Sequence, residues 1–499
     1  MRFSVSCGLW AGLCWGALTA SAQVTAPSPT LSSFFPLGGR PCAAVELAFK
    51  GAELDGASAI QLTRGRDGRA LTVPVKQVPD KKGVLTATLP ADAPAGLYDL
   101  RLVTPLGVSN PRVFQISPLK VVDSPGTNTK PEAAQAAALD SALHGVFKAG
   151  VPHWFSFEGK KGQRVLGTFA GAEWDVRTAL VGSVHDGSGR ELARLRDGLL
   201  ELRLPADGVF KLKLHDLMFG AGDDYGYRFT LTTGPVVWAA GQGAVWGWNL
   251  PGGQGTDLRV LRGPPLEHLQ ADAATIAKLL EASPMMPLKA PEGLALPGVD
   301  KLEPLSVGQA VAGWFPARGA VRSFDLSFKK GERFIIEVAS QRLGFTTDPT
   351  LLVENVKGEA LTPQAEVADP AAPVPAPGTR LLMLDPVYGY EAKADGVFRL
   401  SLSDPTNAAN GRRFPFQLRV RKVEEPAVEG AVAIHAKLPP AAATGPYDLP
   451  AANLWRGGAL AIEVWVPGRT TLSEGAEITV GALPAGVTSL GGFVGRGQS

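Results

Sequence analysis

The feature that most constrains the fold of this chain is a pair of phrases that occurs twice in the same order. Residues 155–164 read FSFEGKKGQR and residues 324–333 read FDLSFKKGER, and each is followed by ADGVF, at 206–210 and 394–398. In each place alternating apolar segments flank a Lys-Lys-Gly or Ala-Asp-Gly turn, a pattern typical of β-hairpins. The sequence therefore predicts a duplicated β-sandwich module.

The composition agrees with a turn-rich β-structure. Glycine occurs 59 times and proline 41 times without a triplet period, and 45% of the residues are hydrophobic, which excludes a collagen-like or disordered chain. A chain of 499 residues is too long for one hydrophobic core, so we expect several tandem domains. The predicted fold class is all-β: tandem β-sandwich modules, Ig-like and jelly-roll, with a few short helices in linkers.

The N-terminus predicts export. Residues 1–22 combine Arg2, an apolar stretch and a small-residue cleavage site at Ala20-Ser21-Ala22, as a signal peptide does. No later stretch reaches 18 apolar residues, so we expect no transmembrane segment after removal of the signal peptide. The mature chain is expected in the periplasm, at the cell surface or outside the cell. Its single cysteine, Cys42, is interpreted as a buried apolar residue.

Basic and acidic residues nearly balance. Loss of Arg2 with the signal peptide reduces the 49 Lys and Arg residues to 48, against 47 Asp and Glu. The basic residues are also scattered, so the sequence gives no reason to expect nucleic-acid binding. Nothing in the sequence indicates an oligomeric state.

Strand patterns and turn clusters divide the mature chain into five units. We name them the first module, copy 1, the middle unit, copy 2 and the C-terminal segment. They are predicted to be an Ig-like sandwich at 31–118, a jelly roll at 119–234, an eroded Ig-like unit at 235–302, a second jelly roll at 303–422 and a partial Ig-like module, cut short, at 425–499.

Two segments inside these units are predicted to be helical, and one is predicted to be a long loop. Residues 119–145 are interpreted as a linker with a short helix opening at Pro131, and residues 266–280 have apolar residues at helical spacing. Lys329 and Ala394 lie 65 positions apart, against 46 for the equivalent residues of copy 1. The PAAPVPAP core of 363–377 makes that stretch the predicted inserted loop.

The repeated phrases resemble the bacterial pre-peptidase C-terminal domain, a small jelly-roll sandwich appended to secreted proteases and other exported proteins. The matching motifs are the KKGQR and KKGER turns, the ADGVF strand starts and the YGYRFTL phrase that closes copy 1. Residues 34–118, with FFPLGGR, GAELDGA and LYDLRLVTPLGVSNP, look like the Ig-like modules that precede such domains in large exported planctomycete-type proteins, and residues 454–488 (LWRGGALAIEV to LPAGVT) look like the Ig-like segment that follows them.

In some members of that family, a Glu-Pro-Asn-Asp phrase at the start of the domain and an Asp-x-Asp before an aromatic residue are associated with calcium. The corresponding stretches here are 124–128 (SPGTN), 151–155 (VPHWF) and 319–323 (GAVRS), and none contains an acid. Calcium needs several oxygen ligands, so neither copy is expected to bind it there.

Three other aspartates form a candidate calcium site. Asp216, Asp223 and Asp224 flank a glycine-containing loop that could fold the last two back toward the first. The alternative is a solvated acidic loop. Calcium-dependent binding predicts a melting temperature that rises with calcium and falls again with a chelator; no other cofactor is predicted.

Catalytic motifs are absent from the sequence. It contains no Gly-x-Ser-x-Gly, His-Glu-x-x-His or Walker phrase. Ser183, His185 and Asp186 include the residue types of a triad, but they lie within one predicted turn, and residues of one hairpin do not converge as nucleophile, base and orienting group. The chain is therefore not predicted to be an enzyme.

Trp246 and Trp248 are the candidate binding residues. Residues two apart share one face of a strand, so both indoles could stack on a sugar ring or a partner, with core packing as the alternative. Other tryptophans are interpreted as core or interface anchors: Trp154, Trp174, Trp314 and Trp455.

These observations predict a non-catalytic exported modular protein that serves adhesion, envelope structure or binding of an extracellular polymer or protein. The alternative is the accessory, non-catalytic portion of a secreted peptidase or other hydrolase. The two hypotheses share the fold and differ in what accompanies it.

Overall fold

The computed structural model describes most of the chain. The described residues are 27–64, 69–169, 176–297, 303–317, 320–367, 384–425, 433–436, 454, 456–459, 462–465, 469–479, 483 and 485–496. The predicted signal peptide, Trp174 and Trp455 lie outside them. The regular secondary structure of the described part is nearly all strand, arranged in tandem sheets, which confirms the predicted fold class. None of its helices is long and apolar enough to cross a membrane.

The first module is a nine-stranded sheet that folds into two layers. Its path is β1-β3-β6-β5-β4-β7-β9-β2, with β8 paired to β7. The layers share β5, which pairs with β4 through Ala70–Pro74 and with β6 through Val75–Gln77. The strands are β1 (Thr30–Phe35), β2 (Gly38–Gly39), β3 (Ala44–Ala52), β4 (Ala59–Arg64), β5 (Ala70–Gln77), β6 (Val84–Thr88), β7 (Gly96–Thr104), β8 (Gly107–Val108) and β9 (Arg112–Ile116).

Side chains in this module follow the predicted alternation. Tyr98, Leu100 and Leu102 are buried, and the intervening Asp99 is exposed, as a period of two requires. Cys42 departs from its prediction. It is exposed and has a φ of 60°, because it lies in the turn before β3 rather than on a strand face.

Copy 1 is a sandwich of two five-stranded sheets with orders β10-β12-β19-β14-β17 and β11-β13-β18-β15-β16. Buried side chains of both sheets form its core, among them Phe155, Phe210 and Phe229. The strands are β10 (Lys120–Asp123), β11 (Gln135–Ala136), β12 (Ser141–Val146), β13 (His153–Gly159), β14 (Arg164–Thr168), β15 (Leu180–His185), β16 (Glu191–Arg194), β17 (Leu199–Arg203), β18 (Gly208–Asp216) and β19 (Gly226–Thr232).

Residues 119–145 belong to this sandwich, so their interpretation as a linker was wrong. They supply β10, β11 and β12, and β10 and β11 pair in parallel with β12 and β13. Only Pro131–Ala133 is helical, as the 3₁₀ turn η1. A parallel partner must arrive by a crossover, and the polar loop after β10 provides that crossing.

Copy 2 repeats the sandwich with one strand fewer. Its sheets have orders β25-β27-β32-β29-β30 and β26-β33-β28-β31. The four-stranded sheet corresponds to β12-β19-β14-β17 of copy 1, so β10 has no described counterpart. The strands are β25 (Glu303–Ser306), β26 (Ala310–Trp314), β27 (Arg322–Phe328), β28 (Arg333–Ala339), β29 (Thr350–Lys357), β30 (Ala360–Val367), β31 (Val387–Glu391), β32 (Gly396–Ser403) and β33 (Pro415–Lys422), with η3 (Gln341–Leu343) and α2 (Pro405–Ala409).

The predicted inserted loop is partly strand. Residues 363–367 complete β30, where Pro363 pairs with Glu354 at a register shift; a proline fits there because an edge strand need not donate on both sides. The rest of the predicted loop, 368–377, lies outside the described residues. The insertion falls between β30 and β31.

The repeated Lys-Lys-Gly and Ala-Asp-Gly phrases do not form hairpins. In copy 1 the first joins β13 to β14 and the second joins β17 to β18, and both connections pass from one sheet to the other. Copy 2 does the same between β27 and β28 and between β31 and β32. The prediction of hairpins was wrong because turn residues do not specify which sheet the next strand joins.

The two phrases contact each other in the same way in both copies. Asp207 Oδ1 accepts from the Lys161 amide at 2.7 Å, and Asp395 Oδ1 accepts from the Lys330 amide at 2.8 Å. The amides of Gly162 and Gly331 donate to backbone carbonyls before the Ala-Asp-Gly turn, at 2.7 and 2.8 Å. The repeated residues therefore lock the two sheet-crossing connections together.

The middle unit is a single sheet with a helix, not a sandwich. Its order is β22-β23-β21-β20-β24, and helix α1 covers one face through Ile276, Leu279 and Leu280. The predicted helix is shorter than expected: residues 267–270 form a strand, and the helix begins after Asp272, whose side chain accepts from the Thr275 amide. The elements are β20 (Val236–Gly241), β21 (Ala244–Trp248), β22 (Gln254–Gly255), β23 (Glu267–Gln270), α1 (Ala273–Ala282) and β24 (Leu288–Lys289).

The C-terminal segment contributes two described strand pairs, β34 (Ala433–Ala436) with β35 (Ile462–Trp465) and β36 (Ala476–Ile478) with β37 (Gly492–Val494). It contacts copy 2 near β28 and β31. Arg333 Nη2 lies 3.5 Å from Glu474 Oε1, and a Cβ on Gly389 would lie 2.6 Å from Thr470 Oγ1. These residues therefore pack against the edge of copy 2.

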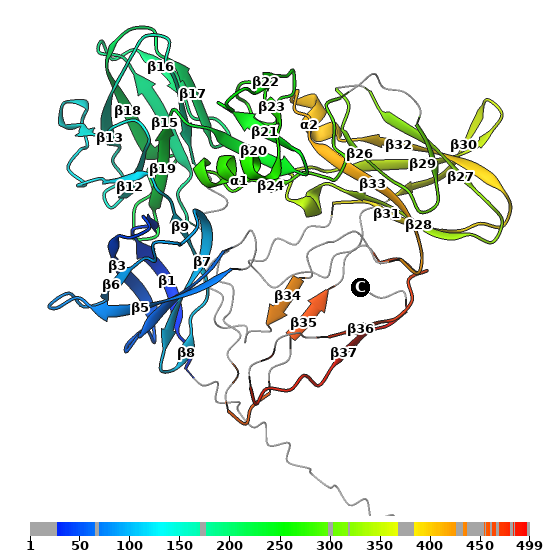
Figure 1. Cartoon of the computed structure of the whole chain (residues 1–499), viewed down its shortest axis with the longest axis horizontal. Coiled ribbons are helices and arrows are strands. Elements are labelled where there is room, and N and C mark those ends of the chain that lie inside the picture. Colours follow the sequence, from blue (N-terminus) through cyan, green and yellow to red (C-terminus); the bar gives the residue numbers. More distant parts are fainter. Residues whose placement is uncertain are drawn as a thin grey trace, which may run out of the picture.

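The units are packed side by side. Copy 1, the middle unit and copy 2 follow the long axis of the molecule, and the first module lies beside copy 1 (Figure 1). Buried apolar residues of the first module and copy 1 form one continuous cluster, and those of the middle unit and copy 2, together with Leu166 and Leu199 of copy 1, form another. Shared apolar clusters therefore join the four units.

The junction between the first module and copy 1 contains a buried arginine. Arg228 is 1% exposed and contacts Gln115 and His144, and a Cβ on Gly38 would collide with its guanidinium. Burial, together with Arg228 beside it, lowers the pKa of His144 to about 4, so His144 is neutral at pH 7. Asp123 lies 3.5 Å from His144.

Candidate functional site

The two candidate binding tryptophans are in the core. Trp246 and Trp248 are 1% and 0% exposed. Trp246 contacts Trp314 of copy 2 at a ring distance of 6.2 Å, and Trp248 donates to Pro264 O at 3.2 Å. This burial corrects the ligand-binding interpretation in favour of packing, since neither indole face is free to stack on a ligand.

The three candidate calcium ligands each have another role. Asp216 is 4% exposed, and its carboxylate accepts from the backbone amides of Ala179, Met218 and Gly220 at 2.8, 3.0 and 2.9 Å. Asp223 pairs with Lys50 of the first module, and Asp224 pairs with Arg177 at 2.7 Å. No metal-suited group of three or more His, Cys, Asp and Glu side chains occurs in the described part of the chain. Calcium at this loop stays a prediction, and the geometry does not support it.

Copy 2 contains the counterpart of Asp216. Asp404 follows β32 as Asp216 ends β18, and it is 1% exposed. Its carboxylate accepts from Asn407 Nδ2 at 2.6 Å and caps α2. The aspartate that ends this strand therefore caps the following turn or helix in both copies.

The stretches that correspond to the calcium-associated phrases of the resembled family do come together in copy 1. Ser124 Oγ lies 2.7 Å from Asn128 Oδ1 and 3.0 Å from His153 Nδ1, and Tyr227 OH lies 2.9 Å from the same nitrogen. Burial lowers the pKa of His153 to about 4, so the imidazole is neutral. A network of neutral groups thus joins the start of copy 1 to β13. A cation site at this place would need carboxylates instead.

The candidate triad does not assemble. Ser183 Oγ lies 2.9 Å from His185 Nε2, but the other ring nitrogen faces Gly189 O at 3.2 Å. Asp186 instead accepts from Ser188 Oγ at 2.6 Å and caps its own turn. The residues are therefore arranged as the turn that the sequence predicted.

Trp154 is not a core anchor. It lies on the outer face of the β11-β13-β18-β15-β16 sheet and is only half-buried, with its ring 5.5 Å from His185 and Lys213 Nζ 5.8 Å from its centroid. The equivalent cross-strand pair in copy 2 is Ser323 and Ser401. Copy 1 therefore has an aromatic, basic outer face where copy 2 has hydroxyl groups. Trp314 is a core residue as predicted, 2% exposed.

Sequence reasoning missed an exposed apolar loop after Asp216. Leu217, Met218 and Phe219 are 58%, 83% and 50% exposed, and Phe219 stacks on His215 at 4.7 Å. The three consecutive apolar residues Leu217, Met218 and Phe219 could have indicated this loop. From the sequence, the loop is considered only for its aspartates, as a calcium site. Hydrogen bonds from the Met218 and Gly220 amides to the Asp216 carboxylate hold this loop in place.

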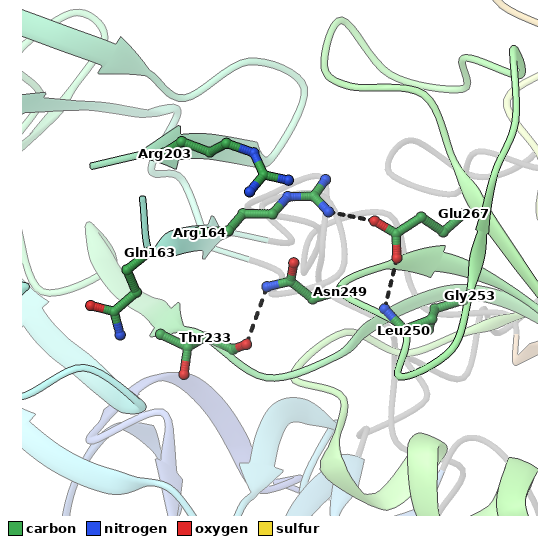
Figure 2. Close-up of a pocket in the computed structure, with 8 residues that line it drawn as sticks. All are labelled: Gln163, Arg164, Arg203, Thr233, Asn249, Leu250, Gly253 and Glu267. Atoms are coloured by element: carbon green, nitrogen blue, oxygen red, sulfur yellow. Dashed lines mark hydrogen bonds and ion pairs between the residues drawn. The ribbon is translucent and has the colours of Figure 1, made fainter. Parts of the chain in front are cut away.

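A cleft lies between copy 1 and the middle unit (Figure 2). Its volume is about 490 Å³, and it opens to solvent. One wall comes from β14, β17 and the end of copy 1, and the other comes from the turn after β21 and from β23. The lining residues are Gln163, Arg164, Arg203, Thr233, Asn249, Leu250, Gly253 and Glu267.

Ion pairs and hydrogen bonds across the cleft hold its walls together. Arg164 contacts Glu267 of the middle unit and lies 2.6 Å from Glu201 of its own sheet. The second oxygen of Glu267 accepts from the Leu250 amide at 2.8 Å. Asn249 Nδ2 donates to Thr233 O at 3.1 Å, and its φ of 53° turns the chain into the cleft. The walls are therefore positioned before any ligand arrives.

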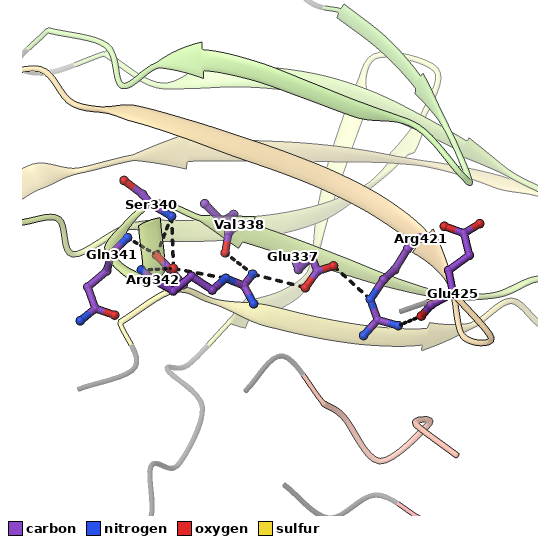
Figure 3. A network of polar contacts seen from close by, with 8 residues as sticks. Glu337, Val338, Ser340, Gln341, Arg342, Arg421 and Glu425 are labelled. Atoms are coloured by element: carbon purple, nitrogen blue, oxygen red, sulfur yellow. Dashed lines mark hydrogen bonds and ion pairs between the residues drawn. The ribbon is translucent and has the colours of Figure 1, made fainter. Parts of the chain in front are cut away.

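Copy 2 holds a buried charge network on the sheet that corresponds to this wall (Figure 3). Glu337 is 0% exposed and accepts from Arg421 Nε at 3.0 Å and Arg342 Nη2 at 3.3 Å. Asp385 accepts from the amides of Gln341 and Arg342 at 2.8 and 2.9 Å. Burial raises the pKa of the Asp385 carboxyl although Arg342 opposes the shift.

Sequence comparisons do not assign the chain to a family: no protein-family model and no curated protein matches it. Similar solved structures include the pre-peptidase C-terminal domain of collagenase from Bacillus anthracis, 9% identical over 25% of this chain and 98% of that chain, with a TM-score of 0.18. SGBP-B of the Bacteroides ovatus mixed-linkage glucan utilization locus, in complex with a mixed-linkage heptasaccharide, is 11% identical over 77% and 72%, with a TM-score of 0.16. The secreted serine protease VesC from Vibrio cholerae is 9% identical over 74% of each chain, with a TM-score of 0.14.

These scores are low, so the fold class rests on the strands and sheets themselves. The resemblance of the two copies to the pre-peptidase C-terminal domain stays a prediction, with one solved member of that family among the similar structures.

Proposed function

We propose that the chain is a non-catalytic, exported binding protein that holds an extracellular polymer in the cleft between copy 1 and the middle unit. The observation that carries the proposal is the cleft itself, about 490 Å³ in volume, with guanidinium, amide, hydroxyl and carboxylate groups in its lining. Export rests on the predicted signal peptide.

The chemistry of the lining favours a hydroxyl-rich chain. Pockets for compact drug-like molecules are mostly apolar, whereas here only Leu250 and Gly253 lack a polar side chain. Polar donors and acceptors exchange bonds with water for bonds with hydroxyl groups at little net cost. An open cleft also lets a long polymer continue beyond the bound segment.

Preorganisation supports the same function. The contacts of Arg164 with Glu267 and of Asn249 with Thr233 join the two walls, and binding to a fixed site avoids the entropic cost of ordering it. The junction is also packed: Leu166 and Leu199 of copy 1 belong to the same apolar cluster as Val236 and Trp248 of the middle unit.

Binding of the chain without residues 1–22 to an array of polysaccharides and extracellular proteins tests the proposal, followed by calorimetry on the ligand found. Asn249→Gly keeps the positive φ and removes the amide from the cleft. We expect it to weaken binding about tenfold, as for loss of one to two hydrogen bonds. Asp80→Gly, at an exposed position of the first module with a φ of 58°, is the matched control and should bind normally. An array without a bound ligand, or equal affinity of the two variants, would overturn the proposal.

A further inference from the structure

Two arginines lie directly opposite each other at the cleft. Arg164 of β14 and Arg203 of β17 are a cross-strand pair, and like charges in this position repel. Arg164 is neutralised by Glu201 and Glu267. Arg203 is exposed, and no hydrogen bond or ion pair to it occurs within the described residues. Figure 2 shows its guanidinium beside that of Arg164 at the cleft.

Copy 2 shows how the same fold arranges this position without the repulsion. The counterpart of Arg164 is Arg333, and the residue opposite it is Glu391. The neighbouring turn residue changes in the same sense, from Gln163 in copy 1 to Glu332 in copy 2. At the three equivalent positions copy 1 carries a formal charge of +2 and copy 2 carries −1. The local charge is therefore a property of copy 1 and not of the fold.

The acids of the cleft do not satisfy Arg203. One oxygen of Glu267 contacts Arg164 and the other accepts from the Leu250 amide, and Glu201 is engaged by Arg164 Nε. A planar guanidinium pairs in a bidentate manner with a carboxylate or sulfate group. The guanidinium of Arg203 is therefore available to an anionic group of a ligand.

We propose that the cleft binds an anionic glycan, with a carboxylate or sulfate group paired to Arg203 and neighbouring hydroxyl groups contacting the amides of Gln163 and Asn249. The inference rests on the proposed function, since it takes the cleft as the polymer site, and it adds the ligand class. Of the two arginines, Arg164 keeps its ion pairs with Glu201 and Glu267, and Arg203 is the one that pairs with the ligand.

Three probes of equal length test the ligand class by calorimetry: a galacturonate hexamer, a sulfated hexasaccharide and a neutral glucose hexamer. At least one anionic probe should bind more tightly than the neutral one, and added salt should weaken its binding. Tighter binding of the carboxylated or of the sulfated probe identifies the anionic group. Equal binding of all three would overturn the anionic assignment and leave the polymer-binding function standing.

Exchanging the residues of the two copies supplies matched variants. Arg203→Glu gives copy 1 the residue of copy 2 and should weaken anionic binding by at least about tenfold, with an unchanged or higher melting temperature because the opposed charges now attract. Glu391→Arg, the reverse exchange in copy 2, should leave binding unchanged. Anionic binding that persists in Arg203→Glu, or failure of both anionic probes to bind the unaltered chain, would overturn the inference. The array of polysaccharides and extracellular proteins decides the proposed function separately.

Discussion

Copy 1 and copy 2 have the same frame and different surfaces. Both lock the Lys-Lys-Gly connection to the Ala-Asp-Gly connection, through Asp207 in one and Asp395 in the other. Both end the following strand with a buried capping aspartate, Asp216 or Asp404. Asp207, Asp395 and Asp216 make these contacts to backbone amides, which are present whatever the neighbouring side chains are. Asp404 accepts from both the backbone and the side-chain amide of Asn407.

The differences lie on the faces that point away from each core. Copy 1 has Trp154 and Arg203 where copy 2 has Ser323 and Glu391. Outward positions of a strand can change without disturbing the inward ones, because their side chains alternate. The two copies therefore share a frame and differ in their surfaces. The cleft lies at copy 1, where Arg203 faces another arginine across the strand pair instead of a glutamate.

The largest expected effect concerns the buried network around Glu337 in copy 2, where copy 1 has Thr168. Glu337→Ala removes the carboxylate that pairs with the buried Arg421 and leaves Arg342 with Asp385 alone, which should cost about 3–5 kcal/mol of stability. Thr168→Ala, at the equivalent buried position of copy 1, should cost about 1 kcal/mol. Scanning calorimetry of the two variants compares them, and equal shifts would show that the network contributes no more than the threonine.

Acid should destabilise copy 1 before copy 2. The pKa of His144 is about 4 in the folded chain and about 6.5 when exposed, so its stabilising contribution is complete above pH 6.5 and is lost as the pH falls toward 4. The loss is on the order of 3 kcal/mol. Copy 2 has Ala312 at this position, and burial raises the pKa of Asp385, so protonation of Asp385 on acidification favours the folded state.

Hydrogen exchange at pH 7 and pH 4.5 locates this effect. The strands around β12 and β19 should lose protection at the lower pH while β28 and β33 retain it. His144→Gln should reduce the loss in copy 1, because glutamine does not titrate. Equal loss of protection in both copies would contradict the assignment to His144.

The shared turn lock should contribute equally in the two copies. Asp207→Ala and Asp395→Ala each remove one acceptor from a backbone amide, and each should cost about 1 kcal/mol, as for loss of a helix cap. Lys161→Ala is the control, because the lock uses only the backbone amide of that residue, and it should change stability by less than about 0.5 kcal/mol. A large difference between the two aspartates, measured by thermal unfolding, would show that the frames are not equivalent.

The smallest expected effect is that of calcium. Asp216 is occupied by three backbone amides, and Asp223 and Asp224 pair with Lys50 and Arg177. Millimolar calcium should therefore leave the melting temperature of the chain unchanged. A rise that a chelator reverses would restore calcium binding at this loop.

The strands of the fold could be predicted from the sequence, and their connections could not. The alternation of apolar residues at Phe210, Leu212 and Leu214 predicts a strand with one buried face, and all three side chains are buried. The sheet-crossing path of the Lys-Lys-Gly turns depends on which sheet receives the next strand, and local residues do not encode that. The same limit applies to Trp246, since spacing by two indicates a shared face but not whether that face is covered.

The cleft was missed because its walls are far apart in the sequence. Arg164 and Glu267 are 103 positions apart, and only tertiary packing brings them together. One signal was available: Arg203 precedes its Ala-Asp-Gly phrase by three residues, and Glu391 precedes the other by three residues. Extending the alignment of the two Ala-Asp-Gly phrases by three residues toward the N-terminus would have shown that the charge is reversed between Arg203 and Glu391.

The arginine that ends each Lys-Lys-Gly phrase makes one ion pair beyond its own sandwich, Arg164 with Glu267 and Arg333 with Glu474. A fragment ending at residue 234 would expose Arg164 and uncover Leu166 and Leu199 to water. The first module shares an apolar cluster with copy 1, and copy 2 shares one with the middle unit. A fragment for expression or grafting should therefore keep these four units together.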